Sequence, residues 1–100
     1  MNEGQIRAGK YRVLSFETPR SRSIYFVVKS DVPVSTYIVD DVGLEDFENG
    51  DSVPSYGGAT RRRNHKGTVM LSGLMKGDPW YLVIHNHNDV TAHIRYEVMY

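Results

Sequence analysis

The chain has 100 residues, of which 40% are hydrophobic and 24% are charged, and its formal net charge at pH 7 is zero. This length suits one domain and the composition is that of a folded globular protein, so we treat residues 1–100 as a single domain. The absence of cysteine excludes a disulfide framework, a thiolate zinc site and a cysteine nucleophile.

The N-terminal residues carry neither the basic region nor the apolar region of a signal peptide. The longest apolar runs are far shorter than a membrane span. We therefore expect a soluble, cytoplasmic protein with no membrane partner.

The first forty residues contain three runs that are typical of β-strands. Residues 9–16 alternate in polarity, and residues 23–29 are apolar on both faces, as expected of an interior strand. Residues 30–33 have the composition of a turn, and residues 34–39 are predicted to form a third strand.

The middle of the chain is less regular. Residues 44–50 predict an irregular connection, with one helical turn capped by Gly50 as the alternative. A short strand is predicted at 53–56, a flexible Gly-Gly joint at 57–58, a basic loop at 61–66 and another alternating strand at 67–74.

The last twenty residues predict a β-hairpin. Residues 80–86 and 91–100 form two strand-like runs around a polar turn, and Trp80 is expected to pack in the core. In the second run the inward side chains are predicted to be Ala92, Ile94, Tyr96 and Val98, with His93, Arg95 and Glu97 outward. Together the runs predict an all-β fold, an antiparallel two-sheet β-sandwich of about seven or eight strands, jelly-roll or immunoglobulin-like.

The closing part of the chain resembles known β-sandwich families. The stretch Trp-Tyr-Leu-Val-Ile-His-Asn at 80–86, followed by Asn88-Asp89 and by Ile-Arg-Tyr-Glu-Val at 94–98, resembles the last hairpin of bacterial pre-peptidase C-terminal domains and of GOLD domains. Those families have a glycine before the aromatic residue; here Asp78-Pro79 intervene, and Gly77 fills that role. The resemblance implies a non-catalytic sandwich that contacts proteins, polymers or an attached enzyme.

A second resemblance involves residues 47–58. This stretch, with Tyr56-Gly57-Gly58 and the arginines that follow, is similar to an uncharacterised bacterial family of sandwich domains found beside TIR signalling domains. The similarity implies an adjacent effector domain as the partner.

Charge is divided into blocks along the chain. Residues 10–30 are mainly basic, residues 31–58 carry only acids, and residues 59–77 carry only bases. Such blocks can produce a dipolar surface suited to charged partners or to head-to-tail homo-oligomers, unless folding interleaves them until they cancel.

The sequence contains no motif that predicts catalysis or a bound cofactor. His85-Asn86-His87 spells the name of a nuclease class whose metal site is built from dispersed residues, and in the predicted hairpin His93 faces away from His85. The acids between 40 and 51 lack the spacing of a calcium loop, and no serine lies in a nucleophile elbow. We therefore expect no enzyme activity, no metal and no cofactor.

The basic stretch is the best candidate for a binding site. Three consecutive arginines offer forked donors that match phosphate or carboxylate, and a nearby tyrosine could stack on a base or sugar. The predicted binding residues are Tyr56, Arg61, Arg62, Arg63, His65 and Lys66. The preferred hypothesis is a module that binds a protein partner or neighbouring domain; the alternatives are a phosphate-bearing or nucleic-acid ligand and a solvated loop without a ligand.

Overall fold

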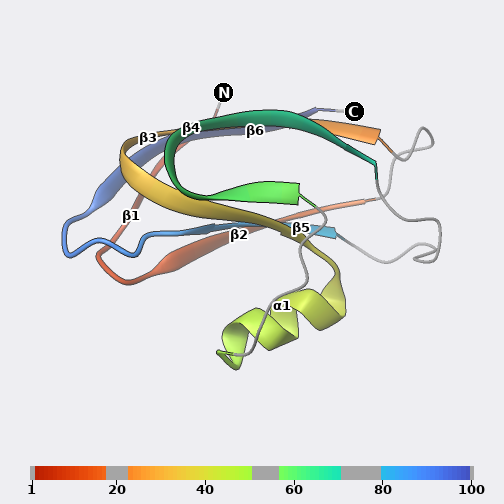
Figure 1. The fold of residues 1–100 in the computed structure, drawn as a ribbon, viewed down its shortest axis with the longest axis horizontal. Coiled ribbons are helices and arrows are strands. Elements are labelled where there is room, and N and C mark those ends of the chain that lie inside the picture. The colour runs from red at the N-terminus through yellow and green to blue at the C-terminus, as the bar shows by residue number, and fades with distance from the viewer. Residues whose placement is uncertain (1, 18–22, 51–56, 71–79, 100) are drawn as a thin grey trace.

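A computed structural model of the chain describes residues 2–17, 23–50, 57–70 and 80–99. Within these ranges the chain forms six strands and one helix (Figure 1). In chain order they are β1 (Asn2–Ile6), β2 (Tyr11–Phe16), β3 (Ser23–Val39), α1 (Asp41–Glu48), β4 (Gly57–Met70), β5 (Trp80–His85) and β6 (Ala92–Met99). The all-β prediction is confirmed, with one short helix in addition.

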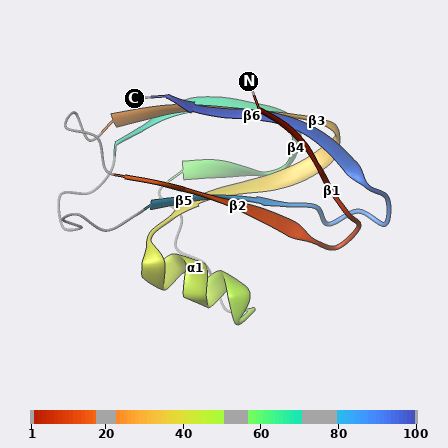
Figure 2. The same cartoon turned by 180° about the vertical axis from the view of Figure 1, so that it is seen from behind.

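The described strands form one curled antiparallel sheet rather than two separate sheets. Its order is β1-β6-β3-β5-β2, and β4 pairs with β3. The first half of β3 pairs with β6, and its second half pairs with β5. The sheet thus folds into a first layer of β1, β6 and the start of β3 and a second layer of β2, β5 and the end of β3, as Figures 1 and 2 show.

The turn predicted at residues 30–33 is wrong, because β3 runs through it. The register with β4 shifts between Lys29 and Val34, which is the signature of a bulge. Pro33 has no backbone N–H to give to a ladder, and the amide of Val32 donates to Ser30 Oγ at 3.3 Å. These residues bend the strand from one layer to the other without ending it.

The predicted hairpin of the last twenty residues is also wrong. Both strands exist, but β5 pairs with β2 and β3, whereas β6 pairs with β1 and β3. The segment between them therefore crosses from one layer to the other. The inward pattern of β6 is confirmed, since Ala92, Ile94 and Tyr96 are buried and Val98 packs against the core.

The hydrophobic core lies between the two layers. Every strand with described side chains on its inner face contributes, and Trp80 is completely buried, as expected. The buried cluster consists of Ile6, Phe16, Ile24, Phe26, Val28, Val34, Ile38, Trp80, Leu82, Ile84, Ala92, Ile94 and Tyr96.

Helix α1 replaces the irregular connection that the sequence predicts. The Asp40 side chain caps its start by accepting from Gly43 N at 2.8 Å, and Gly50 follows its end with φ of 78°. A Cβ atom on Gly43 would lie 2.8 Å from Val39 Cβ, so glycine allows the helix to approach β3 closely. The helix covers the outer face of the second layer (Figure 1).

Asn86 joins the two crossings between the layers. Its buried Nδ2 donates to Ile6 O at 2.9 Å and to Val90 O at 2.8 Å, and its own amide donates to Lys10 O at 2.9 Å. Its Oδ1 accepts from the backbone and side chain of Asn88. One side chain therefore fixes the β1–β2 turn, which the sequence did not predict, against the β5–β6 crossing.

Trp80→Ala should lower the free energy of unfolding by about 3–5 kcal/mol, because it empties the largest buried side-chain volume of the core. Chemical denaturation measures the change. Val90→Ala, at a position that is 52% exposed, is the control and should change stability by no more than about 0.5 kcal/mol. A Trp80→Ala protein that unfolds like the wild type would contradict this role.

Asn86→Ala should cost about 2–3 kcal/mol, because it leaves buried backbone carbonyl groups without their donor. The matched control is Asn64→Ala at an exposed position of β4, which should cost less than about 0.5 kcal/mol. Equal losses in the two variants would show that Asn86 is not an anchor.

Candidate functional site

The predicted basic loop is part of strand β4. Its backbone pairs with β3 in register, with Lys66 opposite Val27, His65 opposite Val28 and Asn64 opposite Lys29. The Gly-Gly joint predicted at 57–58 is the first part of the same strand. The loop prediction is therefore wrong: consecutive arginines look like a loop because they lack apolar alternation, but a strand at the edge of a sheet can carry them.

β4 is an edge strand of the described sheet. Over the ranges that the structure describes, its pairing partner is β3, which uses its other side for β6 and β5. The opposite backbone edge of β4 therefore has no strand partner among the described residues. Such an edge presents a row of N–H and C=O groups that can pair with another chain.

The predicted site residues have different positions on this strand. Arg63 and Lys66 are exposed, as the prediction requires. His65 is half-buried, and its ring stacks on Phe26 at 4.9 Å between centroids, so it also takes part in packing. The structure places Arg61 and Arg62 in β4, while Tyr56 lies outside the described residues. Their roles in binding stay predictions.

A hollow on the outer face of the first layer adds residues that the sequence did not single out. It lies between β3 and β4 and is lined by Val27, Val28, Lys29, Asn64, His65 and Lys66. Lys29 joins the site because the register places it opposite Asn64. Its only signal in the sequence is that it ends an apolar run, which does not reveal its neighbour on a distant strand.

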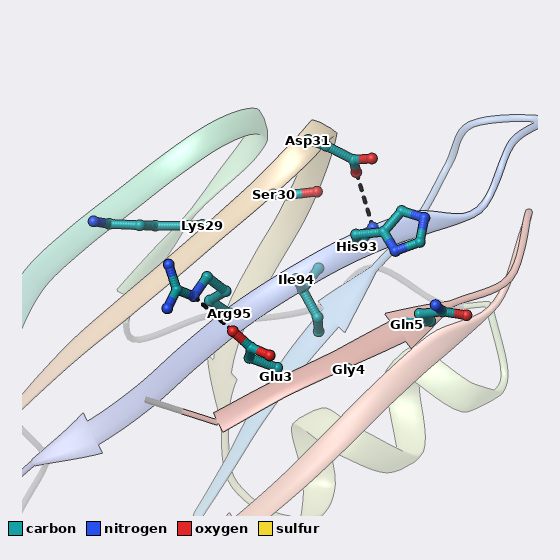
Figure 3. Close-up of a pocket in the computed structure, with 9 residues that line it drawn as sticks. All are labelled: Glu3, Gly4, Gln5, Lys29, Ser30, Asp31, His93, Ile94 and Arg95. Carbon is teal, nitrogen blue, oxygen red and sulfur yellow. Dashed lines mark hydrogen bonds and ion pairs between the residues drawn. The ribbon is translucent and has the colours of Figure 1, made fainter.

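A second hollow continues the same face across β6 to β1 (Figure 3). In it Arg95 Nε and Glu3 Oε1 form an exposed ion pair at 3.1 Å, and Lys29 points away from that pair. Asp31 Oδ1 accepts from the His93 amide at 2.8 Å. The face therefore alternates cations and acids, a pattern that complements a polypeptide surface of mixed charge.

The histidines near the end of β5 serve as packing residues under α1. The His85 ring meets Phe47 edge-on at 5.3 Å, and the His87 ring lies 3.9 Å from His85. Burial lowers the pKa of His85, while a hydrogen bond to the Gly9 backbone acts in the opposite direction. This position explains why an aromatic, uncharged ring is favoured there.

Tyrosine hydroxyl groups hold the acidic helix on the same face. Tyr11 donates to Glu48 Oε2 at 3.0 Å, and Tyr81 donates to Asp41 Oδ1 at 2.8 Å. The hydrogen bond to Glu48 raises the pKa of Tyr11. These acids, which a calcium reading of the sequence would have used, are ligands of tyrosines in the structure.

Two searches for other kinds of site complete the picture. In the described ranges, histidines and acids do not gather in a group of three or more that could hold a metal ion. The helix in those ranges is not long and apolar enough to cross a membrane.

Comparisons with known proteins add no relative: no protein-family model matches the chain, and no curated protein sequence matches it.

Acidification should destabilise the fold partly through His85. Because the folded-state pKa lies below the ordinary value of 6.5, the unfolded chain binds the proton first as the pH falls below 6.5. The free energy of unfolding then decreases until the pH passes the folded-state pKa. His85→Gln should show a smaller decrease between pH 7.5 and pH 5 in denaturation experiments; wild-type and variant curves that stay parallel would contradict the assignment.

Proposed function

We propose that this chain is a non-catalytic interaction module that binds a protein partner or an adjacent effector domain. The partner contributes an extended acidic segment, which pairs with the free edge of β4. The observation that carries the proposal is the position of the basic segment on an edge strand. Backbone pairing supplies affinity there, and Arg63 and Lys66 supply charge selection.

The charges on β4 favour a partner other than β4 of a second copy. Antiparallel pairing of two β4 strands would bring their basic segments side by side, and like charges on paired strands are destabilising. An acidic strand meets the opposite situation. A homo-oligomer would for the same reason be head-to-tail, with the acidic surface of α1 against β4.

The surroundings of the acids support a role without catalysis. Glu3 is paired with Arg95, Asp31 binds a backbone amide, and Glu48 holds a tyrosine. Each thus has a structural task on an open face. General acid–base chemistry instead requires a carboxyl group in a pocket with a substrate position beside it.

The sequence resemblances support the same class of function. Two facing layers around one core suit the sandwich architecture of GOLD and pre-peptidase modules, and we extend the proposal to a two-layer sandwich of that kind. The similarity to domains found beside TIR domains supports a cytoplasmic, bacterial setting with the effector as partner.

A phosphate-bearing or nucleic-acid ligand at the same strand is the second candidate. The hollow that brings Lys29 beside Asn64 and Lys66 favours it, because two cations and an amide can surround one oxyanion. The two candidates differ in salt dependence, since nucleic-acid binding weakens steeply with salt through counterion release.

The test uses a fluorescent peptide of about ten residues, a typical strand length, in which valine and glutamate alternate. Fluorescence anisotropy should detect binding, and the double variant Arg63→Gln/Lys66→Gln should weaken it roughly three- to ten-fold, since each exposed ion pair contributes up to about 1 kcal/mol. Amide hydrogen exchange of residues 63–66 should slow in the complex, as expected of new backbone hydrogen bonds.

The matched control is Arg7→Gln/Lys10→Gln, which removes the same charge from exposed positions of the β1–β2 turn and should leave peptide affinity within about two-fold. Both variants should keep the wild-type melting temperature, because exposed charges contribute little to stability. Equal loss in both variants, or a thymidine oligonucleotide that binds more tightly than the peptide, would overturn the proposal in favour of non-specific or nucleic-acid binding.

A further inference from the structure

The side of the molecule away from β4 carries a second group of cations. Figure 2 shows β1 and β2 toward the viewer and β4 behind them. Arg7 and Lys10 from the connection between β1 and β2, and Arg12 from β2, line one hollow of about 300 Å³ together with Gln5, Ile6 and Tyr11. From this arrangement we infer that the β1–β2 turn is a binding site for a small phosphate-bearing anion.

The backbone of this turn is fixed before any ligand arrives. Lys10 N donates to Arg7 O at 3.0 Å, and Gly9 supplies the left-handed residue with φ of 74°. Asn86 then holds the turn from inside, through the carbonyl groups of Ile6, Arg7 and Lys10. The cations therefore project from a rigid base, which lowers the ordering cost of binding.

Arg12 is held in place by neutral groups. Its Nη1 donates to Tyr96 Oη at 3.1 Å, its Nη2 donates to Gln5 O at 3.4 Å, and its Cζ lies 5.8 Å from the centre of the Tyr96 ring. A Cβ on Gly4 would lie 2.8 Å from Nη1, so glycine gives the guanidinium its place against β1. These contacts orient the group without neutralising it.

The missing counter-charge is what indicates a ligand. Arg12 is half-buried, and such a charge is normally paired in a folded protein. In residues 2–17, 23–50, 57–70 and 80–99, however, the salt bridge found is that of Arg95 with Glu3, and neither Arg12, Arg7 nor Lys10 forms one. Three cations share a hollow with no acid in its lining.

The chemistry of these donors selects phosphate over a carboxylate. Two guanidinium forks and one ammonium group provide many N–H donors, which suit an anion with several oxygens and close to two negative charges. The hollow is at the lower end of the size of small-molecule sites. The Tyr11 ring, 41% exposed, borders it and can contact the organic part of a phosphate monoester.

The experiment is an NMR titration of the ¹⁵N-labelled protein with inorganic phosphate at constant ionic strength. Saturable shifts should appear at the amides of residues 7–12. Arg7→Gln/Lys10→Gln should weaken the affinity about ten-fold or more, as expected when charge-assisted hydrogen bonds are lost. Both side chains are exposed and the turn's backbone bonds remain, so this variant tests the site even if Arg12→Gln does not fold.

Arg63→Gln/Lys66→Gln on β4 is the control with the same change in charge, and it should leave phosphate affinity within about two-fold. Shifts that rise linearly at all basic residues, equal loss in both double variants, or acetate binding as tightly as phosphate would each overturn the inference. None of these readouts uses the acidic peptide, so failure here is separate from failure of the proposed function.

Discussion

The bend of β3 is the constraint on which the rest of the structure depends. A single strand of 17 residues passes through both layers, and each half has a different neighbour, β6 for the first and β5 for the second. Consequently β5 and β6 cannot pair with each other, although they follow one another in the chain. β4 must also bend, because it accompanies β3 through both layers on the other side.

The same bend gives the molecule two unlike edges. On one side lies the free backbone of β4, where an extended chain can continue the sheet. On the other side β1 and β2 end the two layers, and they are joined through side chains and a turn, with Arg12 reaching from β2 to Gln5 O of β1. A backbone-lined edge suits a polypeptide, whereas a turn lined by guanidinium and ammonium groups suits a small anion.

Local pattern in the sequence was sufficient to predict burial. Alternation in residues 92–98 identified the inward side chains, and the apolar run around Phe26 identified an interior strand. These signals are carried by neighbouring residues, and burial of apolar area decides them. Trp80 was predicted correctly for the same reason.

Partner choice between strands was not predictable in this way. Pro33 usually marks a turn, but here it stands at a bulge, and the polar segment after Asn86 reads as a hairpin turn although it connects two layers. The arginines of β4 favour a loop by composition, yet an edge strand tolerates them on its exposed positions. The role of Arg12 depends on Gly4 and Tyr96, which are brought together only by the completed sheet.

Charge shows most clearly why the whole-chain average conceals the sites. The formal net charge is zero, and a molecule with no net charge has no long-range field of one sign. At physiological salt the Debye length is about 8 Å, well below the 29 Å of the intermediate dimension of the molecule. Cations on β4 and on the β1–β2 turn therefore act separately, each on what lies directly beside it, and the acids of α1 do not cancel either group.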